Sequence, residues 1–338
     1  MSHRIPIFGR ALLCAALLVV TSGRSQAKPP QQDASCGQRG HVTFDATTTL
    51  VDANGQPLAR FSGGESAVTL VAPPAEGSEL TKIETGTGRG SFRLAGFVKA
   101  SELRLYTNAA VPIVSGHLWF GVGTRVVAAG SSEGKVRVEK LLTTPFNQRF
   151  SASADCTALG FASPTPPAFS LPNGARVFLM KGDALELFGS LPPTGAALFT
   201  LRRSAQVDSV RFYSREQRGG FVHVRYQGEV SVDAWARAEQ LTPLPRGETI
   251  DPPQSSYTLS SPPQLQLPTP PRSVKSQREL PLRSAPRDSE PPIGVVEPDT
   301  EVFVMESAAG WAKVLPKSLH VLPYGERAFW VKTSDLGL

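Results

Sequence analysis

The sequence is poor in the residues that build catalytic and metal sites. It holds 3 cysteines and 5 histidines among 338 residues, and the histidines are isolated from one another rather than spaced as zinc ligands. It has no Gly-x-Ser-x-Gly elbow with partner residues, and no glycine-rich loop between a strand and a helix. We therefore predict a protein that is not an enzyme, with no catalytic residue, no metal site and no cofactor.

Apolar runs long enough to cross a membrane are also missing. The apolar run at Ala11–Val20 is about half of the ~20 residues that a span needs, and no later segment is more suitable. Arg4 and Arg10 precede this run and Ser25-Gln26-Ala27 follows it, which is typical of a secretory signal peptide at 1–27. We expect cleavage near Ala27, no integral membrane span, and an extracytoplasmic protein, periplasmic or secreted.

A strong excess of one charge is absent too. The formal net charge is +6, and it falls to +3 once the three arginines of the leader are removed. The basic residues are scattered along the chain rather than clustered, so the sequence does not support nucleic-acid binding.

The mature chain keeps two cysteines, Cys36 and Cys156. In an oxidising compartment an even pair of cysteines most often forms a disulfide. We predict that Cys36 and Cys156 are bonded and that the bond is structural.

One eight-residue pattern recurs four times. An aromatic residue lies at or near its start, small or basic residues follow, and an apolar residue or cysteine closes it. The copies are Gly96–Leu103, Arg149–Cys156, Ala234–Leu241 and Phe329–Leu336. Repetition on this scale indicates one small structural unit copied along the chain.

Alternating apolar and polar residues precede each copy of the pattern. The nearest alternations are Leu80–Ile83, Lys135–Val138, Phe221–Val224 and Trp311–Val314, and further ones lie upstream at Val68–Val71, Val126–Ala129 and Val302–Met305. Period-2 alternation is the pattern of a half-buried strand, and helical signals are almost absent. We predict an all-β fold in which each eight-residue pattern pairs with the alternation before it.

Proline-rich tracts separate these units. The longer tract contains Pro252-Pro253, Pro262-Pro263 and Pro270-Pro271, a composition that favours an extended spacer. We predict tandem small barrels joined by Pro-rich linkers: units 1 to 3 at 36–104, 105–162 and 173–242, a linker at 243–279, and unit 4 at 280–338. Units 1 to 3 are expected to pack together, with unit 4 carried on the linker.

The last unit resembles a bacterial SH3-like (SH3b) domain. The resemblance is carried by Leu282-Arg283, the Gly310-Trp311-Ala312-Lys313-Val314 strand, and the closing Phe329-Trp330-Val331 strand with Leu336. Unit 3 is similar but carries extra residues, and units 1 and 2 keep mainly the closing strands. The resemblance implies a small five-stranded barrel that binds peptidoglycan or another protein.

The resemblance also indicates which aromatic residues belong to the core and which are candidates for ligand binding. Because the family uses such positions as barrel core, Trp235 and Trp330 are expected to be core residues. Trp311, Tyr324 and Trp119 are then the candidate ligand-binding aromatics.

The predicted function is a non-catalytic binding protein of the cell envelope, with cell-wall peptidoglycan or an envelope protein as its partner. One alternative is a structural or assembly protein whose units bind each other. A less favoured alternative is a cell-wall cysteine peptidase of the NlpC/P60 type, which Asp155-Cys156, Gly182-Asp183 and His223-Val224 resemble in order. The prolines that follow Cys156 exclude the helix that its activation needs.

Overall fold

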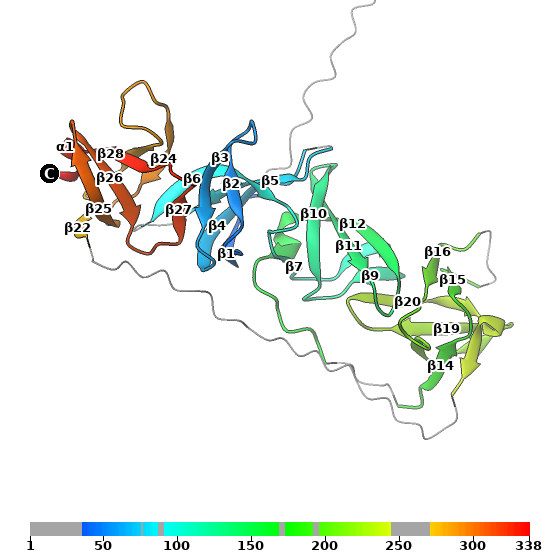
Figure 1. The fold of residues 1–338 in the computed structure, drawn as a ribbon. Helices are drawn as coiled ribbons and strands as arrows, with labels where there is room; N and C mark the ends of the chain where they lie inside the picture. The colour runs from blue at the N-terminus through cyan, green and yellow to red at the C-terminus, as the bar shows by residue number, and fades with distance from the viewer. Residues whose placement is uncertain (1–35, 76, 87–90, 169–172, 192–195, 245–270) are drawn as a thin grey trace, which may run out of the picture. The chain divides into compact units, whose positions relative to one another are not determined.

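The computed structural model describes residues 36–75, 77–86, 91–168, 173–191, 196–244 and 271–338 (Figure 1). The predicted signal peptide and most of the predicted linker lie outside these residues. The described residues form 28 strands in sheets of thirteen, five and ten strands, which confirms the all-β prediction. None of these sheets closes into a barrel, so the barrel architecture stays a prediction.

A three-stranded antiparallel meander occurs four times along the chain. The strands are β4 (Glu65–Ala72), β5 (Leu80–Thr85) and β6 (Phe92–Lys99); β10 (Arg125–Ser132), β11 (Lys135–Leu142) and β12 (Gln148–Ala154); β17 (Arg211–Ser214), β19 (Phe221–Tyr226) and β20 (Val230–Arg237); and β25 (Glu301–Ala308), β26 (Trp311–Pro316) and β28 (Phe329–Lys332). Within each set the strands pair in order, and the sequence patterns predicted each of these strands except β17.

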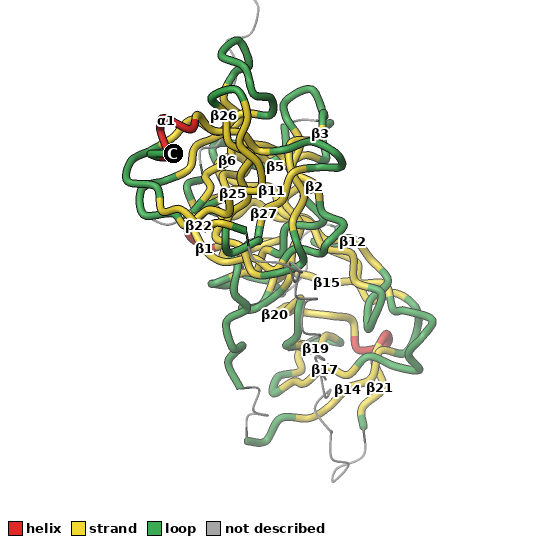
Figure 2. The backbone as a smooth tube through the Cα atoms, turned by 60° about the vertical axis from the view of Figure 1, so that its left-hand side comes forward, coloured by secondary structure: helices red, strands yellow, loops and turns green. Residues whose placement is uncertain are grey.

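The eight-residue pattern covers the end of β6 and of β20, nearly all of β12 and all of β28, and it continues into the turn after each strand. A single helical turn follows β12, β20 and β28: two 3₁₀ turns at Cys156–Ala158 and Ala238–Gln240, and helix α1 at Thr333–Leu336. The apolar residue that closes the pattern is buried at Leu103, Leu241 and Leu336, so it anchors the turn to the core. Figure 2 shows how short these helical pieces are beside the strands.

The remaining strands surround the meanders. The first segment has β1 (Gln38–Thr43), β2 (Thr49–Val51) and β3 (Pro57–Phe61), and the second has β7 (Leu105–Thr107), β8 (Val111–Val114), β9 (Leu118–Phe120) and β13 (Leu159–Gly160). The third segment has β14 (Arg176–Met180), β15 (Ala184–Phe188), β16 (Phe199–Arg202), β18 (Gln217–Arg218) and β21 (Leu241–Pro243). The last segment has β22 (Arg272–Lys275), β23 (Leu280–Arg283), β24 (Pro292–Val296) and β27 (Val321–Pro323). In the second and third segments, the strand after the turn returns to the first strand, β13 to β7 and β21 to β14.

Strand pairs also join segments that are distant in sequence. Strand β24 pairs with β6, and β27 pairs with β3, so the last segment extends the sheet of the first. Strand β9 of the second segment pairs with β20 of the third. The sequence indicated a last unit carried on a linker, and it held no sign of these pairings between segments.

The disulfide predicted from the cysteine pair is present. Cys36 and Cys156 are bonded across a sequence separation of 120, and the bond ties the start of the first segment to the turn after β12. In the chain-entropy model, closing a loop of this length contributes about 4–5 kcal/mol.

A candidate ligand-binding face

The outer face of β17, β19 and β20 carries aromatic and charged side chains. Along β19 the side chains alternate between the core and this face: Val222 and Val224 are buried, whereas His223 and Arg225 are half-buried on the other side. Because successive residues of a strand point to opposite faces, the period of two in the sequence places His223 and Arg225 together. Strand β20 adds Asp233 and Trp235 by the same alternation.

The centre of the face is a stacked pair bound to a carboxylate. The rings of His223 and Trp235 lie opposite each other in the β19–β20 register, with centroids 4.8 Å apart and planes inclined by 26°. Asp233 Oδ1 lies 2.6 Å from His223 Nε2, and its Oδ2 lies 3.0 Å from Arg225 Nε. The carboxylate therefore holds the imidazole and the guanidinium in fixed positions beside the indole.

Tyr213 extends the row onto β17, where it pairs in register with Arg225. Burial is the main cause that raises the pKa of the Tyr213 hydroxyl above its ordinary value; Arg225 lowers this pKa and Asp233 raises it. The hydroxyl is therefore protonated at neutral pH, and it can donate a hydrogen bond as well as accept one.

Trp119, one of the three predicted ligand-binding aromatics, also lies on this face. It pairs with Ser231, and Ser231, Asp233 and Trp235 lie on the same side of β20 because they are two residues apart. The β8–β9 hairpin of the second segment thus adds an aromatic residue to a face built mainly by the third.

A hollow of about 420 Å³ adjoins the face. His117, Phe188 and Leu198 are among the residues that line it. The Phe188 ring meets the Phe221 ring edge-on at 5.7 Å, and the Arg237 guanidinium lies 5.3 Å from the Phe188 centroid. His117 Nδ1 is 3.1 Å from the backbone oxygen of Asp233, so the hollow and the face share one stretch of β20.

The other two predicted aromatics lie in the last segment, away from this row of strands. Trp311 on β26 is only 8% exposed, and its ring faces two cations, Lys332 Nζ at 5.7 Å and the Arg283 guanidinium at 6.0 Å. Tyr324 is 41% exposed in the turn after β27. The three candidates therefore do not converge on one site.

The sequence missed His223, Asp233 and Trp235 as site residues. The resemblance had assigned Trp235 and Trp330 to the core, but the structure leaves both half-buried. Trp235 lies on the outer face, stacked on His223. The alternation within 221–226 and 230–237 could have placed His223, Arg225, Asp233 and Trp235 on one face, had the two strands been read as a pair.

Among the described residues, this face carries neither a cluster of metal-ligating side chains nor a free cysteine. Across the described ranges, no group of three or more His, Cys, Asp or Glu residues is placed to hold a metal ion. Cys156, the nucleophile that the peptidase alternative needs, is bonded to Cys36. His223 is instead paired with Asp233.

Comparison with known proteins gives no relative: no family model, no curated protein and no solved structure matches the chain. Within the described residues, no helix has both the length and the apolar character that crossing a membrane requires.

Proposed function

We propose that the protein is a non-catalytic, extracytoplasmic binding protein built from SH3-like units, and that the face around His223 and Trp235 binds the glycan of a cell-wall polymer. The signal-peptide pattern and the Cys36–Cys156 disulfide are both compatible with an oxidising compartment outside the cytoplasm.

The strand connections favour SH3-like units. Each segment has a meander, and in three segments the meander ends in a helical turn. In the second and third segments the chain then returns to pair with its own first strand, as the five-stranded topology of the resemblance requires.

One observation carries the binding proposal: a half-buried indole, an imidazole, a carboxylate and a guanidinium lie together on an outer sheet face. A solvent-facing sheet surface is normally polar, so aromatic rings there indicate contact with something else. A sugar ring has an apolar face and a rim of hydroxyls. Trp235 and Trp119 suit the apolar face, whereas Asp233 and Arg225 suit the hydroxyls.

The experiment is retention on purified, protein-free peptidoglycan. Replacing Trp235 by Ala removes the stacked ring, and we expect retention to fall about tenfold or more, equivalent to 1.4 kcal/mol. Asp233→Asn keeps the shape but releases His223 and Arg225 from the carboxylate, and it should also weaken retention. The matched control is Tyr324→Ala, which removes an exposed aromatic of the last segment.

Two outcomes would contradict the proposal. If the wild-type protein is retained no better than an unrelated protein of similar charge, the polymer is not its ligand. Equal retention of the Trp235→Ala variant and the wild type would show that the polymer binds to another surface of the protein.

The second candidate function is a structural or assembly protein. The pairing of β24 with β6 and of β27 with β3 favours it, since these strand pairs join different segments edge to edge. Chains that assemble with one another but are not retained on the polymer would support this function over the first.

A further inference from the structure

The first and last segments meet along two strand edges, which we call the seam. Residues Phe92–Leu94 of β6 pair with Gly294–Val296 of β24, and Ala59–Phe61 of β3 pair with Val321–Pro323 of β27. Two further backbone bonds flank these pairs, from Ser62 N to His320 O and from Glu297 N to Ser91 O, at 3.1 and 3.0 Å. The last segment thus covers two edges of the first segment with its own strands.

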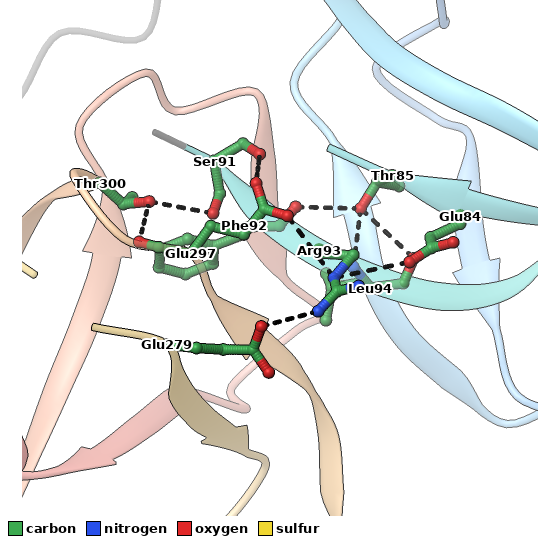
Figure 3. A network of polar contacts seen from close by, with 9 residues as sticks. All are labelled: Glu84, Thr85, Ser91, Phe92, Arg93, Leu94, Glu279, Glu297 and Thr300. Carbon is green, nitrogen blue, oxygen red and sulfur yellow. Dashed lines mark hydrogen bonds and ion pairs between the residues drawn. The ribbon is translucent and has the colours of Figure 1, made fainter. Parts of the chain in front are cut away.

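Polar side chains reinforce the seam (Figure 3). Arg93 Nη2 lies 2.9 Å from Glu279 Oε2, and Arg93 Nε lies 3.6 Å from both Glu297 Oε1 and Glu84 Oε1. Ser91 Oγ donates to Glu297 Oε2 at 2.9 Å, and Thr300 Oγ1 donates to the backbone carbonyl oxygen of Ser91 at 3.1 Å.

These polar contacts add only moderately to the stability of the seam. The Arg93 side chain is 38% exposed, and ion pairs of that exposure are worth about 0.2–1 kcal/mol each. Apolar burial contributes as well: the rings of Phe92 and Phe329 lie with centroids 5.8 Å apart, and Leu94 and Phe61 on the acceptor strands are fully buried. The seam therefore combines strand pairing, apolar burial and exposed charges, and another copy of the last segment would offer all three.

From this seam we propose a second partner: another copy of the same chain, whose last segment docks on β6 and β3 in place of the chain's own. Every copy carries the same donor strands and the same acceptor edges, so exchange creates no new contact and loses none. Residues 245–270 connect the third segment to the last, and 26 residues reach at most about 90 Å when extended.

Concentration decides between the closed chain and the exchanged pair. Because the last segment is joined covalently to the rest of its chain, its effective concentration at its own seam is on the millimolar scale at most. Dilute chains are therefore closed, and exchange grows as the local concentration of chains rises. Chains gathered on a polymer would meet that condition and link to one another.

Gly294 offers a way to break the seam from the donor side alone. A Cβ at this position would lie 2.3 Å from the backbone carbonyl oxygen of Arg93 and 2.6 Å from Leu94 Cδ2, both in the first segment. Gly294→Ala therefore blocks docking, because the atoms nearest to the added methyl group all belong to the first segment. The matched control is Gly182→Ala, where a Cβ meets no atom within 4 Å and the backbone φ is not positive.

Arg93→Glu breaks the seam from the acceptor side. It places a third carboxylate against Glu279 and Glu297, but the last segment of that chain stays able to dock elsewhere. A mixture of the two variants then contains one intact donor, on the Arg93→Glu chain, and one intact acceptor, on the Gly294→Ala chain.

The measurement is the mass in solution by sedimentation or light scattering, without polymer, so that it does not depend on the proposed function. We expect wild type and Gly182→Ala to shift from monomer to dimer as concentration rises towards about 1 mM, the scale of the effective concentration. Each seam variant alone should stay monomeric, and their mixture should form a dimer containing one chain of each.

Three results would overturn the proposal. The first is a wild-type chain that stays monomeric over that range. The second is a Gly294→Ala chain that dimerises as readily as wild type, which places the contact on another surface. The third is a mixture with no more dimer than its components, which excludes exchange even if one variant folds poorly.

Discussion

The two joints between segments share strand pairing but differ in the balance of their side-chain contacts. The seam between the first and last segments adds one ring contact, Phe92 with Phe329, and the charges of Arg93 and its carboxylates. The joint between the second and third segments, where β9 pairs with β20, adds one ion pair, Lys140 with Glu229, and two ring contacts: Phe146 lies 5.3 Å from Tyr226, and Phe150 lies 5.7 Å from Phe199.

In the joint between the second and third segments, the side chain of Gln148 also takes the place of a neighbouring strand. The Gln148 amide donates to Thr200 O and accepts from Arg202 N, both at 3.1 Å, so it pairs with the edge of β16. Phe146 and Arg203 form a β-bridge next to it. Buried rings give this joint a stability that salt does not screen, whereas the seam depends partly on exposed charges.

The largest effect should come from Phe146→Ala, which would break the aromatic joint. Phe146 is fully buried, and removing a buried phenylalanine ring costs about 3–5 kcal/mol of unfolding free energy. Urea unfolding checks this value. Leu141→Ala is the control, since its side chain is 56% exposed and its loss should stay within about 0.5 kcal/mol. Equal losses in the two variants would contradict the difference in burial.

The second prediction concerns pH at the same joint. Burial, followed by the charge of Glu229, raises the pKa of Tyr226 from 10.0 to about 12. The folded state then holds a proton that the unfolded state loses, so stability is complete below pH 10 and falls as the pH rises towards about 12. The fall amounts to roughly 2–3 kcal/mol at 1.36 kcal/mol per pKa unit.

Urea unfolding at several alkaline pH values measures this slope. Tyr226→Phe should remove most of it, and Tyr324→Phe, in an exposed turn, should leave it unchanged. If the unfolding free energy of Tyr226→Phe falls with pH as steeply as that of the wild type, other titrating groups cause the fall.

A smaller effect should follow Gln148→Ala. The variant loses two neutral hydrogen bonds to β16, each worth about 1 kcal/mol, so a loss of about 2 kcal/mol is expected. Hydrogen exchange of the Arg202 amide should also accelerate, while that of Leu201 changes less. Replacing the exposed Gln217 by Ala is the control. Unchanged exchange at Arg202 would show that another group supports the β16 edge.

The smallest effect sharpens the contrast between the two joints. Arg93→Ala should cost about 1 kcal/mol or less at low salt, with faster hydrogen exchange in β24. At about 1 M salt, where charges are screened within about 3 Å, the difference should disappear. Phe146→Ala should show no such salt dependence. A loss that salt does not alter would mean that Arg93 acts by packing.

Local patterns predicted every strand of the four meanders except β17, and the even pair of cysteines predicted the disulfide. Alternation in Phe221–Val224 and Trp311–Val314 specifies strands directly, and neighbouring strands pair across short connections. The seam could not be predicted, because Leu94 and Gly294 carry no local mark of their pairing. Trp119 was found as an isolated aromatic, whereas His223 and Asp233 form a site only through the register of β19 with β20.

The seam also determines the order in which the protein can be completed. Gly294 follows its partner Leu94 by 200 positions, which at the usual pace of synthesis is a delay on the order of 10–40 s. During that interval the edges of β6 and β3 are bare strands, the kind that attract other chains. The earliest segment to be made is therefore among the last to be finished, and a chain that stops before β24 would leave the ribosome with its first sheet open.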